Sequence, residues 1–277
     1  MRIMFQFYKS LSLDIAFGAV GMMWFVGQLL ESNFAANYYL LMFLSVWIIY
    51  TSDHLLDAEH IKNEAISHRH RLHQRYSRIL LLLVFVAMGC AMAMLPAGFI
   101  AFSRSKAIFF IALVVSYFIG INLFYQLFKF IKEIFASLLY AGGIVLVPFH
   151  FMQQPVTALA LVIFIAIFLL ALSNLLLFSL LDYEDDLTNK QKNLSHIIGK
   201  IPTKKLIYSL NTISILFSVG SMCALKEPKL SFYALLALIL SVIAMRVTQC
   251  KSPDNTKLLA DGIFLLPYLL IPFFQLN

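Results

Sequence analysis

The stretch "YYLLMFLSVWIIYTSDHLLDAEH", residues 38–60, begins as an uncharged apolar run and ends in a group of acidic residues. Two of them, Asp53 and Asp57, are spaced four residues apart just after the run. A carboxylate at the edge of an apolar run has a high desolvation cost unless water, a cation or another partner lies beside it. The stretch therefore predicts a membrane-spanning helix whose polar end has a partner.

The composition of the whole chain is that of a membrane protein. Hydrophobic residues make up 61% of 277 positions and the mean hydropathy is +0.85, whereas soluble domains are about half apolar. Little chain remains between the apolar stretches, so we expect one all-α domain over residues 1–277, a polytopic bundle of about nine transmembrane helices. The stretches long enough to cross about 30 Å of hydrocarbon are residues 11–30, 35–52, 79–98, 105–125, 134–152, 157–181, 206–224, 230–246 and 258–275.

The distribution of Lys and Arg predicts the orientation, because cytoplasmic loops are enriched in them. With a cytoplasmic N-terminus, 17 of the 21 Lys and Arg residues fall in cytoplasmic segments, and only Arg104, Lys106, Lys226 and Lys229 fall outside. We therefore expect a multi-pass protein of the bacterial inner (plasma) membrane with its C-terminus outside. Because the basic residues are divided among several loops, the net charge of +7 indicates contact with anionic lipid and no nucleic-acid partner.

The acidic residues are concentrated at two helix ends on the expected cytoplasmic side. Seven of the 14 follow the second and the sixth apolar stretches: Asp53, Asp57, Glu59, Asp182, Glu184, Asp185 and Asp186. Each group contains two aspartates four residues apart, which a continuing helix would place on one face. Such like charges repel, so two identically spaced pairs favour divalent cations over merely solvated helix ends. Oxygen ligands favour Mg²⁺, which also binds diphosphates.

These features resemble the UbiA superfamily of intramembrane prenyltransferases, whose pattern is nine helices and two aspartate-rich motifs on cytoplasmic loops. The first family motif, N-x-x-x-D-x-x-x-D, is matched at Asp53 and Asp57, but Ile49 stands at the asparagine position. The second, D-x-x-x-D, is matched by Asp182 and Asp186 in "DYEDD". A third element, Y-x-x-x-K, is present as Tyr125 and Lys129 in "YQLFK".

The resemblance implies Mg²⁺-dependent transfer of a polyprenyl group from its diphosphate to a hydrophobic or aromatic acceptor. It implies that Mg²⁺ binds to the four aspartates and that Tyr125 and Lys129 complete the catalytic set. The expected diphosphate-binding residues are Lys129, Arg69, Arg71 and Lys192, although topology alone also accounts for basic residues in these loops. The expected partners are the prenyl diphosphate, the acceptor and membrane lipid, with no obligate protein partner.

Other functions remain open on the sequence. A membrane terpene cyclase of the same fold, or a non-catalytic prenyl-diphosphate binder or transporter, would share the motifs, and Ile49 keeps the non-catalytic alternative open. A CDP-alcohol phosphotransferase is disfavoured because its D-G-x-x-A-R signature is absent.

Five of the seven histidines lie close together in the sequence, at His54, His60, His68, His70 and His73. A di-iron oxygenase is nevertheless disfavoured, because such a site needs more histidines from several helix ends. Two further carboxylates, Asp14 and Asp261, lie near the cytoplasmic ends of apolar stretches, where they could line the cavity, although we expect both to reach interfacial water. We expect Asn174 to pair with a neighbouring helix.

Overall fold

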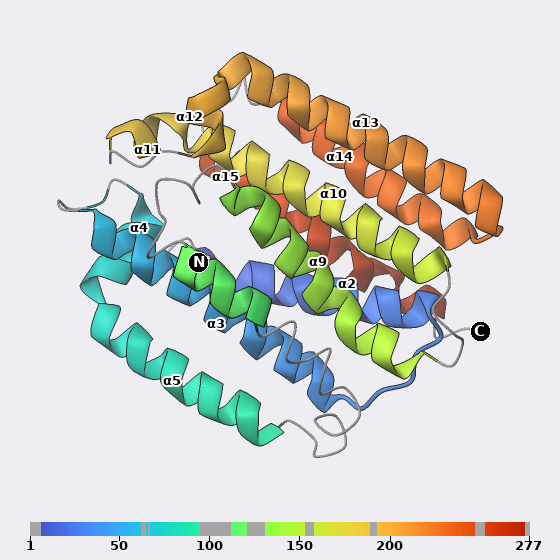
Figure 1. The fold of residues 1–277 in the computed structure, drawn as a ribbon, viewed down its shortest axis with the longest axis horizontal. Helices are drawn as coiled ribbons and strands as arrows, with labels where there is room; N and C mark the ends of the chain where they lie inside the picture. The colour runs from blue at the N-terminus through green and yellow to red at the C-terminus, as the bar shows by residue number, and fades with distance from the viewer. Residues whose placement is uncertain are drawn as a thin grey trace.

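The computed structural model describes residues 7–61, 65, 67–94, 112–120, 131–152, 158–188, 193–246 and 253–274. Within these ranges the chain is made of helices and short connections, with no β-strand. The long helices run side by side, and several short helices lie at one end of the bundle (Figure 1). The prediction of an all-α protein is confirmed.

The described part of the chain contains both long helices and short helical elements. The long helices are α2 (Leu13–Leu29), α3 (Asn37–His60), α5 (Ser77–Met94), α9 (Lys132–Phe151), α10 (Ala158–Leu181), α13 (Lys200–Leu225) and α14 (Ser231–Arg246). The shorter elements are α4 (His68–Arg75), α11 (Tyr183–Thr188), α12 (Leu194–Ile198), η1 (Pro228–Leu230), α15 (Pro253–Gly262), η2 (Ile263–Leu270) and α16 (Ile271–Phe274). Residues 112–120 are also helical.

Six helical segments in the described part of the chain are long and apolar enough to cross a membrane. Their apolar side chains are widely exposed on the outer helices: on α5, Leu82 and Phe85 are each 63% exposed. Such a surface is unfavourable in water but suits contact with lipid. The protein is therefore a multi-pass membrane protein. The six segments found in the described part of the chain are Asn37–Glu59, Ser77–Met94, Lys132–Phe151, Ala158–Leu181, Lys200–Leu225 and Pro228–Met245.

The remaining three predicted spans are not among these six segments. The span expected at 11–30 corresponds to α2, which has 17 residues. The span expected at 258–275 is divided among α15, η2 and α16, with Pro267 inside η2. Proline lacks the N–H that an α-helix needs, so an apolar stretch that contains it does not continue as one regular helix. Of the stretch 105–125, only residues 112–120 are described, and the count of nine spans is not confirmed.

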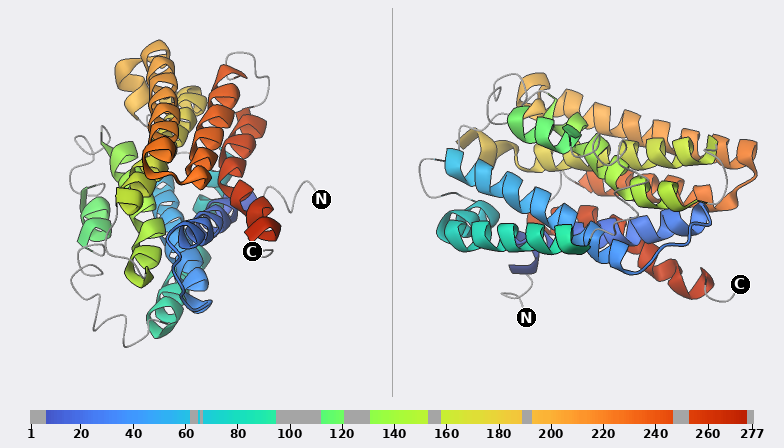
Figure 2. Two further views of the ribbon diagram at one scale, coloured as in Figure 1. Left: turned by 90° about the vertical axis from the view of Figure 1, so that its right-hand side faces the viewer. Right: turned by 60° about the horizontal axis from the view of Figure 1, so that its bottom comes forward.

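The helix α10 forms the centre of the bundle. It contacts α9, α13, α14 and α15, and Ile163, Ile167 and Leu170 on it are completely buried. On the other side of the core, α2 approaches η2 closely: a Cβ atom added to Gly18 would lie 2.9 Å from Phe264 Cβ. Small residues allow such close approach between membrane helices. The outer helices α5 and α13 lie on opposite sides of this core (Figure 2).

The C-terminal end of α3 and the junction of α10 and α11, which carry the two acidic pairs, lie at the end of the bundle that carries α4, α11 and α12 (Figure 1). As predicted, α3 continues past its apolar run to His60, which places Asp53 and Asp57 on one face of the helix. The second pair spans the junction between α10 and α11. There the Asp186 N–H donates to the Asp182 carbonyl at 2.8 Å, so the helical spacing of this pair is also maintained.

Candidate functional site

All four aspartates of the two pairs line one cavity of about 290 Å³. Asp53 and Asp57 face it from α3, and Asp182 and Asp186 face it from the junction of α10 and α11. Its volume lies near the lower end of the range for small-molecule sites, roughly 300–1,000 Å³. The two pairs are far apart in sequence, and the fold brings them together as the motif pattern predicts.

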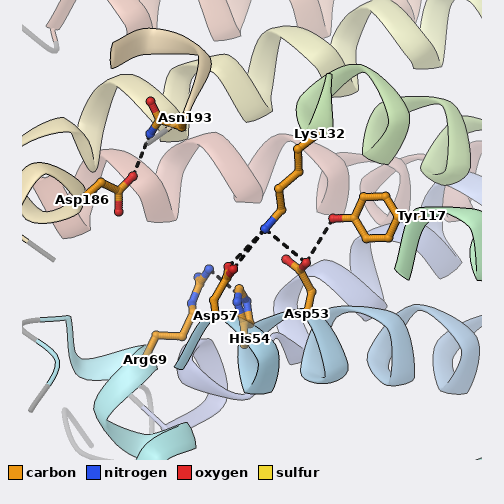
Figure 3. Close-up of polar contacts among 8 residues, drawn as sticks. All are labelled: Asp53, His54, Asp57, Arg69, Tyr117, Lys132, Asp186 and Asn193. Atoms are coloured by element: carbon orange, nitrogen blue, oxygen red, sulfur yellow. Dashed lines mark hydrogen bonds and ion pairs between the residues drawn. The ribbon is translucent and has the colours of Figure 1, made fainter. Parts of the chain in front are cut away.

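Lys132, at the start of α9, forms ion pairs with both aspartates of the first pair (Figure 3). Its Nζ lies 3.2 Å from Asp53 Oδ1 and 3.2 Å from Asp57 Oδ2. The Tyr117 hydroxyl donates a hydrogen bond to Asp53 Oδ1 at 3.1 Å. The first pair is therefore held by a lysine and a tyrosine that come from later segments of the chain.

The second pair has a different environment. Asp182 forms an ion pair with Lys257, whereas Asp186 accepts a hydrogen bond from Asn193 Nδ2 at 2.7 Å. Burial, together with the neighbouring carboxylates of Asp182 and Asp57, raises the pKa of Asp186 to about 8. Within the described ranges Asp186 has no ion pair, so its carboxyl is largely protonated near neutral pH and ionises when a cation binds beside it.

The donor atoms at this end of the cavity fit a hard divalent cation. Four carboxylates provide oxygen ligands of the kind that Mg²⁺ prefers, and the two lysines beside them compensate only part of the charge. The sequence-based argument nevertheless needs a correction. It required divalent cations to relieve the repulsion within each pair, but Lys132 and Lys257 already relieve part of it. Each of these lysines is 75 residues from an aspartate partner, so sequence spacing does not show the contact.

The other predicted site residues have different outcomes. Arg69 lines the cavity, and its Nη1 lies 3.4 Å from His54 Nε2 (Figure 3). Arg71 is not among the lining residues; its Nε donates to the Ala65 carbonyl at 3.2 Å, because α4 directs it toward the connection after α3. The prediction that Arg71 binds the diphosphate is therefore not supported by its position. Tyr125, Lys129 and Lys192 lie outside the described residues.

Sequence reasoning missed several residues of the cavity wall. Tyr117 and Lys132 contact the first aspartate pair. In the sequence, Lys132 is only one of the basic residues that predict the orientation in the membrane. Glu133 accepts a hydrogen bond from the Leu194 N–H at 3.2 Å, which fixes α12 beside the cavity. Asn193 then orients Asp186. The only signal for the lysine and the glutamate was the presence of charges at the start of an apolar stretch.

Asp14 and Asp261 form a second pair of carboxylates, which interact with each other and with Arg69. Asp14 is 2% exposed and Asp261 is 6% exposed, so the expectation that both reach interfacial water is wrong. Asn174 on α10 donates to Asp261 Oδ1 at 3.4 Å, which is the interhelical pairing predicted for it. Asp261 and Asn174 both line the cavity, and Arg69 interacts electrostatically with both Asp14 and Asp261.

The fold and the cavity define the class of the protein as a multi-pass all-α membrane protein with an acidic cavity at one end of its helical bundle. Comparison with protein-family models, curated proteins and solved structures finds no match to this chain.

Proposed function

We propose that this protein is an intramembrane prenyltransferase of the UbiA type, which transfers a polyprenyl group from its diphosphate to a hydrophobic or aromatic acceptor. The proposal is supported above all by the convergence of both aspartate pairs on a cavity with apolar walls, among them Val46, Ile49 and Leu139. Acidic groups that bind a cation suit the diphosphate, and the apolar wall suits the hydrocarbon chain.

Asp53, Asp57, Asp182 and Asp186 would hold Mg²⁺ in this proposal. A bound Mg²⁺ supplies positive charge that favours departure of a diphosphate. Arg69, which lines the cavity, would bind phosphate oxygens through its planar guanidinium group, and Lys132 would keep the carboxylates of α3 in position. Tyr125, Lys129 and Lys192 remain predicted contributors to catalysis or diphosphate binding.

The rings on the cavity wall have a further role in the proposal. Tyr50, Tyr117 and Tyr140 line the cavity, and aromatic faces attract a cation such as the prenyl group that develops positive charge. The apolar surroundings exclude water, which would otherwise consume that cation.

We also propose that the acidic end of the bundle faces the cytoplasm of a bacterium. The 17-to-4 division of Lys and Arg supports a cytoplasmic N-terminus and an outer C-terminus. In this orientation a soluble or peripheral acceptor and the diphosphate product exchange with the cytoplasm.

A non-catalytic prenyl-diphosphate binder is the second candidate, and a specific observation favours it. Lys132 and Lys257 pair with three of the four aspartates, so ammonium groups occupy positions beside the carboxylates where a catalytic cation would bind. Such a protein would bind its ligand equally well in the presence of a chelator.

Incubation of the purified protein with Mg²⁺, prenyl diphosphates of several lengths and a panel of acceptors tests the proposal, with products identified by mass spectrometry. A prenylated acceptor is the expected product. A cyclised or hydrated hydrocarbon formed without any acceptor would instead identify a terpene cyclase, and intact diphosphate in every mixture would identify a binder.

Metal binding is expected to strengthen as pH rises toward 8. Because the pKa of Asp186 is raised to about 8, this carboxyl is largely protonated at pH 6.5 and must lose a proton when it binds a cation. Affinity for Mn²⁺ or Mg²⁺ should therefore be about tenfold or more lower at pH 6.5 than at pH 8.5.

Calorimetric titrations in buffers of different ionisation enthalpy measure the proton release directly. The control is Glu184→Gln, which changes an exposed carboxylate that pairs with Lys200 and should leave the pH dependence intact. Equal metal affinity at both pH values, without proton release, would exclude Asp186 from the ligand set.

An amide at position 49 is expected to tighten Mg²⁺-dependent binding of a prenyl diphosphate. Ile49 lines the cavity one helical turn before Asp53, so Ile49→Asn adds a neutral oxygen ligand on the same face. The free energy of binding is expected to become more favourable by about 0.5–1.5 kcal/mol. Ligand titration at several Mg²⁺ concentrations measures it. Ile48→Asn is the matched control, because position 48 is turned by about 100° around the helix. Equal effects of the two variants would show that position 49 contributes only packing.

A further inference from the structure

Three metal-ligating side chains lie together on the wall of the cavity: His54 and Asp57 on α3, and His70 on α4. One ligand atom from each residue lies within 4.8 Å of the others. His54 and Asp57 are three residues apart on one helix, so they share a face, and α4 packs against α3 and adds His70. Small side-chain rotations bring such atoms to the roughly 3–4 Å separations expected around one metal with bonds of about 2.1 Å.

The two histidines of this group differ from the other histidines of α4 in the hydrogen bonding of Nδ1. His54 is 8% exposed, and the Nδ1 atoms of His54 and His70 are buried and have no hydrogen-bond partner in the part of the chain that the structure describes. Two other histidines of α4 have partners there: His68 Nδ1 lies 3.0 Å from Ser10 Oγ, and His73 Nδ1 lies 2.9 Å from the Arg69 carbonyl. Buried nitrogen atoms without partners are costly. Two of them belong to the histidines beside Asp57, and a third is Nε2 of His73, whose ring is held by the contact of Nδ1 with the Arg69 carbonyl.

Two positive side chains, Lys132 and Arg69, border this group. Lys132 pairs with Asp57 but also with Asp53, so it retains an ion pair if Asp57 turns toward a metal. Arg69 contacts the Nε2 atom of His54. The Nδ1 atom of the same ring is therefore still able to bind a metal. Imidazole nitrogen suits transition metals such as Zn²⁺, Mn²⁺ and Fe²⁺, whereas Mg²⁺ prefers oxygen ligands alone.

We propose that His54, Asp57 and His70 form a binding site for a divalent transition-metal ion. With two histidines, one carboxylate and positions left for water or another ligand, its donor set is that of a three-residue metal site with open coordination. The site goes beyond the proposed transferase function, because it binds metal without a prenyl diphosphate. Asp57 is common to both donor sets.

Co²⁺ is the first probe, because its visible absorption reports coordination by nitrogen. The full-length protein, purified in detergent and stripped of metal by a chelator, is titrated with Co²⁺ in excess Mg²⁺, and Zn²⁺ is then added as competitor. We expect binding of one equivalent, displacement by Zn²⁺ and resistance to Mg²⁺. His70→Ala and Asp57→Asn should each weaken Co²⁺ binding by about tenfold or more.

The control variant is His68→Ala, which removes a histidine from the same helix that is bonded to Ser10. It should bind Co²⁺ as the unchanged protein does, and thermal unfolding without metal verifies that each variant is folded. Equal affinity of His70→Ala and His68→Ala, or displacement of Co²⁺ by Mg²⁺ at similar concentrations, would overturn the proposal.

Binding of a prenyl diphosphate, measured separately, distinguishes this site from the transferase function. Co²⁺ bound through His70 in a protein that does not bind any prenyl diphosphate would refute the transferase alone. Prenyl-diphosphate binding in a protein whose Co²⁺ affinity is independent of His70 would refute the triad alone.

Discussion

Asp186→Asn is expected to abolish Mg²⁺-dependent binding of a prenyl diphosphate. Asp186 has no ion pair within the described segments and accepts a hydrogen bond from the neutral amide of Asn193, so no ammonium group competes with a cation for its carboxyl group. The substitution keeps the size of the side chain and its contact with Asn193 but removes the negative charge that the carboxyl acquires when it binds a cation. Loss of one charged ligand costs about 2–5 kcal/mol, which removes most of the binding at ordinary ligand concentrations.

Asp53→Asn should have a smaller effect on the same titration. Lys132 and Tyr117 already bind Asp53, so part of its charge is compensated before any metal enters. Asp185→Asn is the matched control on α11, because Asp185 does not line the cavity. If Asp186→Asn binds the ligand normally, or if Asp53→Asn is equally severe, the second pair does not dominate the site.

Lys132→Met is expected to destabilise the metal-free protein and to increase its stabilisation by Mg²⁺. Without the ammonium group, Asp53 and Asp57 face each other with no cation between them. The decrease in the free energy of unfolding should be smaller than the roughly 3–5 kcal/mol lost when a fully buried ion pair is broken, because the Lys132 side chain is 29% exposed. Added Mg²⁺ should restore much of this loss, since the freed carboxylates become better ligands.

Thermal unfolding with EDTA and with Mg²⁺ measures both effects. The control is Lys200→Met, which breaks an exposed ion pair with Glu184 and should change stability by no more than about 1 kcal/mol. If Mg²⁺ stabilises Lys132→Met no more than the unchanged protein, the first pair does not bind a cation. That outcome would favour the non-catalytic binder.

The helical bundle could be predicted well from local composition, because an apolar run that crosses a membrane must satisfy its backbone hydrogen bonds within itself. The extension of α3 through Asp57 followed from the spacing of the acidic pair. The interruption at η2 was missed, because hydropathy counts apolar residues and takes no account of the missing N–H of Pro267.

The site was only partly predictable, because it depends on contacts between distant segments. The aspartates were visible as repeated motifs, but Tyr117 lies 64 residues from Asp53 and Lys132 lies 75 residues from Asp57. The same reason applies to the histidines. The proximity of His54 and Asp57 follows from helical spacing, whereas His70 joins them only because α4 packs against α3.

Release of inorganic diphosphate from a prenyl diphosphate by the purified protein, with Mg²⁺ and with EDTA, tests most directly whether the four aspartates form a catalytic metal site. The assay includes the acceptor panel and the Asp186→Asn and Asp185→Asn variants. We expect Mg²⁺-dependent release by the unchanged protein and by Asp185→Asn, and none in EDTA or by Asp186→Asn. Release that persists in EDTA, or no release from a prenyl diphosphate of any length, would contradict the proposed function.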